Sequence, residues 1–314
     1  MTRYLVQRLL FLVPTLIGIT VIVAALIRLV PGGAVVTFCQ EGCTAEQRVQ
    51  IKKQLGLDKP FPVQYATWVG NALRGDLGQS YQDKRDVAKD IATRLPVTFQ
   101  LGAMAMVFGL LISLPIGVIS AIRQDTMTDY ISRSAAIAAL STPNFWIATV
   151  FIAYMGKLYN WAPPLTYQSF LQSPVDNLII TGIPAVILGI GLTGTVLRLT
   201  RAQMLEVMRQ DYIRTAWSKG LRERTVIMRH AIRNAFIPVI TLVGLQIPVL
   251  VGGSVILETI FNVPGIGRYL VTAINQRDFP IIQGVDLVLA IVIVVANLVV
   301  DLSYSLVDPR IRYS

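Results

Sequence analysis

Six long apolar segments, separated by polar ones, dominate the hydrophobic pattern of this chain. A helix needs about 20 apolar residues to cross the hydrocarbon core of a bilayer, which is roughly 30 Å thick. The pattern therefore predicts an all-α membrane protein with about six transmembrane helices. The predicted spans are Leu9–Leu29, Thr98–Ile122, Ala135–Leu158, Leu178–Leu199, Phe236–Leu257 and Val285–Val307. No A-x-A-like site follows the first segment, which favours an uncleaved anchor over a signal sequence.

Basic residues are unevenly distributed between these spans. They gather before the first span and after the second, fourth and sixth: Arg3, Arg8, Arg123, Arg133, Arg198, Arg201, Arg209, Arg214, Lys219, Arg222, Arg224, Arg229, Arg233, Arg310 and Arg312. The short alternate segments contain only Lys157, Arg268 and Arg277. Because Lys and Arg in short loops stay on the cytoplasmic side, both termini are predicted to be cytoplasmic.

The composition agrees with a membrane protein and argues against nucleic-acid binding. The chain is 54% hydrophobic and 15% charged, with a mean hydropathy of +0.59. An ordinary soluble domain is closer to a quarter charged. The net charge of +10 would suit nucleic acid, but many of the basic residues lie in short segments between apolar runs, as topology signals do.

The long polar segment Pro31–Pro96 is predicted to be a small helical unit outside the cell. Thr44 and Gln47 have the spacing of a capping box, and Gly56 and Pro60 stand where a helix would stop. An apolar stripe then predicts a helix before the turn at residues 75–78; its members are Tyr65, Trp68, Val69, Ala72 and Leu73. A second stripe, Val87, Ile91 and Leu95, leads into the second span.

Two interpretations of these outer helices stay open. They either cover the outer ends of the spans or form a docking surface for an external partner. Cys39 and Cys43 lie in the same segment. A local disulfide between them fits an oxidising compartment, but the sequence does not decide whether they pair.

Several kinds of site chemistry are excluded by the residues present. One histidine, His230, and two cysteines rule out a Cys/His-rich metal site and leave little room for a Ser–His or Cys–His nucleophile pair. No G-x-x-x-x-G-K-[ST] segment occurs, so the chain has no phosphate-binding loop of its own. The G-x-G-x-x-G pattern at Gly189–Gly194 lies inside an apolar run, where small residues indicate close helix packing instead.

Prolines and charges within the spans bear on transport. Pro143, Pro184, Pro238 and Pro248 interrupt or open apolar helices and predict kinks, which suit moving helices but also occur in static bundles. The few charges, Arg28, Asp286 and Asp301, lie near span ends, and Asp301 is a candidate structural partner of Arg198 or Arg201. A mid-membrane charge cluster would favour the alternative function, a gradient-driven secondary transporter of small solutes.

The segment Asp211–Gly220 in the basic loop before the fifth span has the pattern of a short helix. Asp211 suits an N-cap, and Gly220 suits a left-handed residue that ends the helix, followed by apolar Leu221. One predicted face is apolar and contains Tyr212, Ile213, Ala216 and Trp217. Such a face needs a cover, which is either the lipid headgroup layer or a partner protein.

The chain resembles the permease subunits of ATP-binding-cassette (ABC) importers of the dipeptide, oligopeptide and nickel branch, and specifically the first of the two permeases. The matching segments occur in order along the chain: residues 4–9 (YLVQRL), 55–60 (LGLDKP), 75–80 (GDLGQS), 211–216 (DYIRTA), 233–235 (RNA), 258–261 (ETIF), 264–267 (PGIG) and 308–312 (DPRIR).

This resemblance implies a type I ABC importer fold and a role for Asp211–Gly220. Such permeases carry an EAA motif there, whose short helix engages the ATPase. Ala216 and Gly220 match its second alanine and its glycine, whereas Arg214 and Thr215 replace its glutamate and first alanine. The implied coupling residues are Asp211, Tyr212, Ile213, Arg214, Thr215, Ala216, Trp217, Lys219 and Gly220.

The resemblance also implies partners and a division of the chain. The complex would hold a second homologous permease, two ABC ATPase subunits or one two-headed ATPase, and an extracytoplasmic solute-binding protein, in a bacterial or archaeal cytoplasmic membrane. ATP and Mg²⁺ would be bound by the ATPases, and this chain would hold no cofactor or metal. Residues 1–30 would form the N-terminus and first span, 31–96 the outer helical region, and 97–314 a five-helix core with the coupling loop at about 200–235. Dipeptides, oligopeptides, nickel chelates and oligosaccharides all remain open as the solute.

Overall fold

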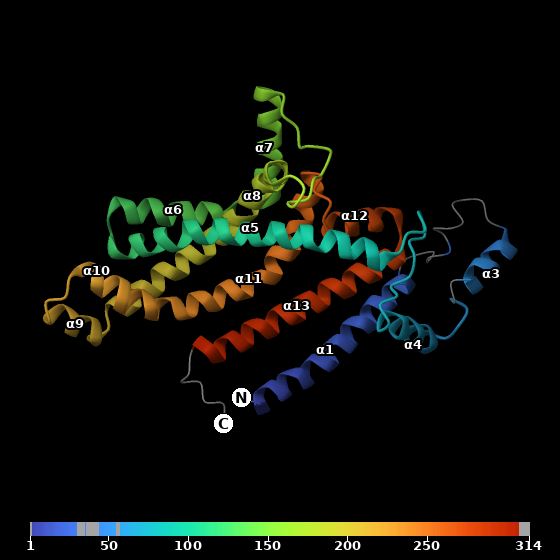
Figure 1. Ribbon diagram of the computed structural model, residues 1–314, viewed down its shortest axis with the longest axis horizontal. Helices are drawn as coiled ribbons and strands as arrows, with labels where there is room; N and C mark the ends of the chain where they lie inside the picture. Colours follow the sequence, from blue (N-terminus) through green and yellow to red (C-terminus); the bar gives the residue numbers. More distant parts are fainter. Residues whose placement is uncertain (1, 30–34, 36–43, 55–56, 308–314) are drawn as a thin grey trace. The chain divides into compact units, whose positions relative to one another are not determined.

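The computed structural model describes residues 2–29, 35, 44–54 and 57–307, and these residues are almost entirely helical (Figure 1). Among the described residues the only β pairing is an isolated bridge between Gln79 and Asp86. The helices are α1 (Thr2–Leu29), α3 (Ala45–Gln54), α4 (Phe61–Ala72), α5 (Val87–Ile122), α6 (Met127–Ser141), α7 (Asn144–Tyr159), α8 (Pro174–Met208), α9 (Asp211–Ser218), α10 (Glu223–Thr225), the π-helix η2 (Val226–Ala231), α11 (Ile232–Ile260), α12 (Ile266–Gln276) and α13 (Phe279–Val307).

The chain forms two compact units. Among the described residues, the first unit comprises those from Thr2 to Val97 with Pro264–Val295, and the second comprises Thr98–Val263 with those from Ala296 to Val307. Each unit is therefore built from segments that are distant in the sequence.

The first unit has its core where three helix ends meet. Val87 and Ile91 at the start of α5 are buried against Ile266, Tyr269 and Ala273 of α12 and Ile281 and Val285 of α13. Gly284 fits this core because an added Cβ would lie 2.8 Å from Val87 Cγ1. The predicted second stripe is thus confirmed as a buried helix face.

The predicted capping box is confirmed at α3. The Thr44 amide donates to Gln47 Oε1 over 2.9 Å, and the Gln47 amide donates to Thr44 Oγ1 over 3.3 Å. These two bonds satisfy amides that a helix N-terminus otherwise leaves unpaired. The predicted stop at Gly56 lies outside the described residues, and Pro60 instead directly precedes α4.

The predicted first stripe lies on α4, which packs beside α1. Tyr65 and Trp68 are half-buried, and the Tyr65 hydroxyl shares a 2.8 Å hydrogen bond with Thr20 Oγ1 of α1. Leu73, at the end of the stripe, is 84% exposed. The stripe is therefore covered at its beginning and open at its end.

The second unit is organised around α8, which packs against α5, α6 and α11. An added Cβ on Gly189 would lie 2.7 Å from the Ala105 carbonyl oxygen of α5. One on Gly194 would lie 2.8 Å from the Ala136 carbonyl oxygen of α6. The glycine pattern at Gly189–Gly194 thus permits close helix contact, as predicted.

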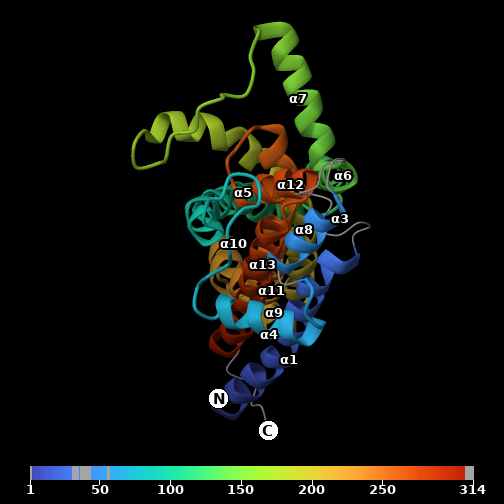
Figure 2. The same cartoon turned by 90° about the vertical axis from the view of Figure 1, so that its right-hand side faces the viewer.

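The predicted third span, Ala135–Leu158, is wrong as a single continuous helix. The chain instead forms α6 and α7, which meet at 93°, and Figure 2 shows α7 extending away from the end of α6. Pro143 separates them, because proline forces the preceding residue out of helical geometry. Thr142 accordingly has an extended backbone, with φ −98° and ψ 118°. Pro184, Pro238 and Pro248 remain inside α8 and α11.

Four helical segments are long and apolar enough to cross a membrane: Val87–Ile122, Pro174–Met208, Glu223–Ile260 and Phe279–Val300. The bent pair of α6 and α7 provides a fifth if it crosses once. The described apolar part of α1 is shorter, Leu12–Ala25. The predicted second, fourth and fifth spans fall within three of these helices, whereas the predicted third span crosses the break between α6 and α7. The count of six and the orientation stay predictions.

Candidate functional site

The helix predicted in the basic loop is present as α9, and it begins one residue earlier than predicted. Gln210 occupies the N-cap position, with φ −71° and ψ 148°, and Asp211 is the first helical residue. The Asp211 carboxylate accepts a 3.2 Å hydrogen bond from Arg214 Nη1 and does not cap the helix. Its charge still lies in the first turn, near the positive end of the helix dipole.

Gly220 ends this helix in the predicted left-handed conformation, with φ +72°. The Leu221 amide donates to the Ala216 carbonyl over 3.4 Å, and the Gly220 amide donates to the Trp217 carbonyl over 2.9 Å. This pair of bonds defines a Schellman motif. The prediction for Gly220 is therefore confirmed.

The apolar face of α9 is divided between buried and exposed residues. Ile213 is fully buried and Ala216 is 6% exposed, whereas Tyr212 and Trp217 are 43% and 40% exposed. Ile213 and Ala216 belong to a core cluster formed by this chain, together with Ala121, Met204, Val207, Val226, Ile227, Ala231 and Ala235. The interpretation that the whole face lacks a cover is thus wrong, because α8, η2 and α11 already cover half of it.

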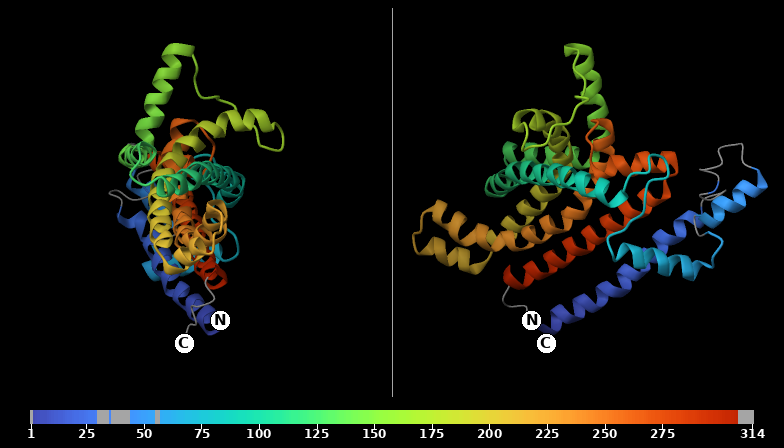
Figure 3. Two further views of the ribbon diagram at one scale, coloured as in Figure 1. Left: turned by 90° about the vertical axis from the view of Figure 1, so that its left-hand side faces the viewer. Right: turned by 45° about the vertical axis from the view of Figure 1, so that its right-hand side comes forward.

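A side-chain hydrogen bond also joins α9 to the start of α11. Figure 3 shows the chain of α9, α10 and α11 turning back at one end of α8. Asn234 Nδ2 donates to the Tyr212 hydroxyl and to the His230 carbonyl, both over 3.0 Å. His230 lies in the π-helix η2, which directly precedes α11. The π-helix η2 was not predicted from the sequence. Asn234 belongs to the segment Arg233-Asn234-Ala235, which was noted only for its resemblance to the permease family.

The remaining predicted residues of α9 are exposed. Arg214 pairs with Asp211, with 73% and 95% of the two side chains exposed. The Thr215 hydroxyl donates to the Asp211 carbonyl over 3.0 Å, and Lys219 is exposed at the C-cap. The polar surface of α9 is thus solvated, and its exposed aromatic side chains are Tyr212 and Trp217.

Two buried carboxylates of the second unit were missed by the sequence analysis. Glu258, fully buried at the end of α11, accepts hydrogen bonds from Thr98 Oγ1 over 2.7 Å and from Ser254 Oγ over 3.0 Å. Asp129 of α6 is also fully buried and forms two 2.7 Å hydrogen bonds with Arg201 of α8. Arg201 therefore has a different partner from the suggested Asp301, whose side chain lies outside the described residues.

Neither metal nor disulfide chemistry can be assigned to this chain from the structure. Within the described ranges, no group of three or more His, Cys, Asp and Glu residues is arranged to hold a metal ion. Cys39 and Cys43 lie outside the described residues.

Similarity to known proteins extends along the whole chain. Residues 113–313 match the family described as binding-protein-dependent transport system inner membrane component, and residues 1–102 match the N-terminal region of such components. A peptide transport system permease protein of Brucella abortus is 38% identical, with 100% of both chains covered. The dipeptide transport system permease protein of Escherichia coli K12 is 36% identical, over 100% of this chain and 99% of that one.

A solved structure shares the fold. It is the MetNI methionine ABC transporter in an inward-facing conformation, with a TM-score of 0.55 and 17% identity. The match covers 69% of this chain and 96% of that chain. With these matches, the chain belongs to the family of inner membrane components of binding-protein-dependent transport systems, the permease subunits of ABC importers.

Proposed function

We propose that this chain forms half of the translocation path for peptides or similar small solutes, delivered by an external binding protein. The names of the relatives, which refer to peptide and dipeptide transport, support the solute class because the matches span the full chain. A second homologous permease would form the other half of the path. Separate ATPase subunits would bind ATP and Mg²⁺, in keeping with a sequence that has no phosphate-binding loop.

A coupling role for α9 is supported by the fact that one side of this helix is buried and the other side is exposed. Ile213 and Ala216 fix the helix to its own chain, while Tyr212 and Trp217 on its other side are about two-fifths exposed. A helix anchored in this way can receive force from a partner and pass it to the helices behind it. Exposed aromatic side chains next to solvated charges are also typical of residues that dominate protein interfaces.

The path of this force is set by the contacts of α9. Ile213 and Ala216 share a core cluster with Met204 of α8 and Ala235 of α11. The Asn234–Tyr212 hydrogen bond adds a polar link to α11. Because α8 and α11 are two of the long apolar helices, movement of α9 on ATP binding would tilt two spans together.

Trp217→Ala tests this role with little damage to the fold, because Trp217 is outside the buried cluster. We expect the variant to insert normally but to lose most of its co-purifying ATPase and at least tenfold in uptake, as for an interface hot spot. The matched control is Met127→Ala, an exposed apolar residue at the α5–α6 turn that is 73% exposed. Both quantities are measured for the assembled complex in proteoliposomes.

The alternative is a helix that lies on lipid headgroups. In that case Trp217→Ala would lower the membrane affinity of α9 slightly and leave the ATPase bound. Retention of the ATPase and of uptake at the Met127→Ala level would reject the coupling assignment. Ala216→Glu would not discriminate, because it places a charge in the core of this chain.

A further inference from the structure

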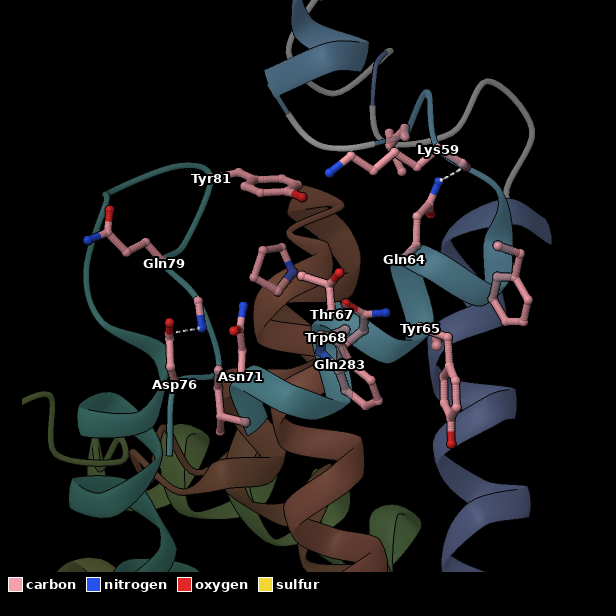
Figure 4. A pocket seen from close by; sticks show the side chains of 16 residues that line it. Lys59, Gln64, Tyr65, Thr67, Trp68, Asn71, Asp76, Gln79, Tyr81 and Gln283 are labelled. Atoms are coloured by element: carbon pink, nitrogen blue, oxygen red, sulfur yellow. Dashed lines mark hydrogen bonds between the residues drawn. The ribbon is translucent and has the colours of Figure 1, made fainter. Parts of the chain in front are cut away.

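A pocket of about 420 Å³ lies in the first unit (Figure 4). Its volume falls in the range of small-molecule sites. The walls come from α4, from the segment that joins α4 to α5, and from the first turns of α13. Figure 4 shows polar side chains from these elements directed into the same space as the Trp68 ring.

A buried carboxylate holds the two sides of this pocket together. Asp278 directly precedes α13 and is fully buried. Its Oδ2 accepts hydrogen bonds from Ser80 Oγ over 2.6 Å and from the Tyr81 amide over 2.9 Å. Tyr81 lines the pocket on one side and Pro280 and Gln283 line it on the other. The pocket is therefore preformed, because its walls are joined by short bonds to one buried group.

The pocket offers fixed hydrogen-bond acceptors. Gln283 is only 7% exposed, and its amide nitrogen donates to the Val23 carbonyl over 3.3 Å. Gln64 is held similarly, by a 2.8 Å bond from its amide nitrogen to the Lys59 carbonyl. In both side chains the amide oxygen has no hydrogen-bond partner among the described residues. Two fixed amide oxygens that line a pocket and are not used within the protein favour a ligand with N–H groups.

The rest of the lining adds aromatic surface and two opposite charges. Trp68 and Tyr65 provide apolar faces, and Asp76 is the only acidic and Lys59 the only basic residue among those that line the pocket. Figure 4 shows Lys59 at the upper edge and Asp76 at the lower left. Burial, with a contribution from Asp278, raises the pKa of Tyr81 to about 12, so its phenol stays protonated at neutral pH.

We propose that this pocket binds short peptides with free termini. The ligand ammonium lies at Asp76, the carboxylate lies toward Lys59, backbone amides donate to Gln64 and Gln283, and a side chain packs on Trp68. This inference rests on the proposed peptide transport and adds a first binding site for the solute, distinct from the path through the spans.

The test uses the full chain, assembled with its partner subunits in nanodiscs and without nucleotide. Binding of trialanine is titrated by saturation-transfer NMR. Asp76→Asn removes the charge but keeps an oxygen that can accept from the Gly78 amide, as Asp76 Oδ1 does over 2.9 Å. We expect Asp76→Asn to weaken trialanine binding about tenfold, the effect of one lost charge-assisted hydrogen bond. Asp58→Asn, an exposed acidic residue that does not line the pocket, should bind like the parent.

Blocking the peptide provides a second arm. N-acetyl-trialanine should bind the parent about tenfold more weakly, and Asp76→Asn should then have no further effect, because the same contact is already lost. Gln283→Leu should weaken both ligands. The site is overturned if trialanine does not bind saturably, if Asp76→Asn binds like Asp58→Asn, or if the acetylated peptide binds the parent equally well.

Parallel uptake assays separate this inference from the proposed function. ATP-driven peptide uptake by the parent complex without binding in the pocket would overturn the site alone. Binding in the pocket without peptide uptake would overturn the proposed function and leave the site in place.

Discussion

Gly220 shows how one backbone angle fixes the end of α9. Its φ of +72° allows the Schellman bonds that return the chain toward η2. This feature is readable from the sequence because only glycine adopts such an angle without strain. The burial of Ala216 is not readable in the same way, because a small apolar residue suits a partner surface as well as the core of its own chain.

Two substitutions at position 220 can show whether the site requires glycine itself or only a residue that adopts a positive φ. Gly220→Val should be strained by about 1 kcal/mol or more, because a β-branched residue opposes a positive φ. Gly220→Asn should be much milder, since asparagine tolerates the left-handed region. Apart from its neighbours in the chain, no atom lies within 4 Å of a Cβ added at Gly220. A difference between the valine and asparagine variants would therefore not be caused by steric crowding of the Cβ. ATP-driven uptake should fall for valine and stay near the parent for asparagine; equal loss in both would contradict this account.

At the scale of elements, helix positions follow from the sequence and their partners do not. The capping box at Thr44 and the stripe at Val87 and Ile91 depend on local spacing, so both were predicted. Thr142 and Pro143 carry a local signal for a break, but the 93° angle between α6 and α7 depends on how each helix packs. The contact of Asp129 with Arg201 joins residues 72 positions apart, a separation that no local pattern encodes.

The Asp129–Arg201 pair should contribute strongly to the attachment of α6 to α8. Asp129 is fully buried, and 18% of the Arg201 side chain is exposed. Asp129→Asn leaves a largely buried guanidinium without its charge partner, which costs roughly 3–5 kcal/mol. The exposed pair of Asp211 and Arg214 is a matched control, where Asp211→Asn should cost below about 1 kcal/mol. The midpoint of thermal unfolding in detergent should therefore fall at least about three times further for Asp129→Asn than for Asp211→Asn. Equal shifts would show that burial does not strengthen this pair.

At the scale of the whole molecule, the two units mix distant parts of the chain. Residues 264–295 join the N-terminal 97 residues, whereas the sequence analysis divided the chain at consecutive boundaries. Hydrophobic length predicts each span separately but carries no information about which spans associate. The pocket of the first unit depends on this long-range pairing, because Gln64 and Gln283 line it from opposite ends of the sequence. It could not be found from the sequence for that reason.

The membrane topology can be tested with single cysteines in exposed described positions, in a background where Cys39 and Cys43 are replaced by serine. Gln50→Cys, Gln172→Cys and Asn275→Cys are expected to lie outside, and Gln124→Cys and Ser218→Cys inside. An impermeant thiol reagent should label only the first three in intact cells and all five after permeabilisation.

Gln124 and Gln172 decide whether the bent pair of α6 and α7 crosses the membrane. Gln124 lies before α6 and Gln172 lies after α7, and only these two helices separate them along the chain. If the pair crosses once, Gln124→Cys is protected and Gln172→Cys is labelled in intact cells. If the 93° bend instead makes a re-entrant loop, both positions share one side and the segment with Ser218 must then face outward. If Ser218 faced outward, the basic residues around α9 would also lie outside the cell. This would contradict the rule that Lys and Arg in short loops stay on the cytoplasmic side. Labelling of Ser218→Cys in intact cells would therefore overturn the proposed contact of α9 with a cytoplasmic ATPase, and protection of both Gln124→Cys and Gln172→Cys in the same cells would overturn the single crossing.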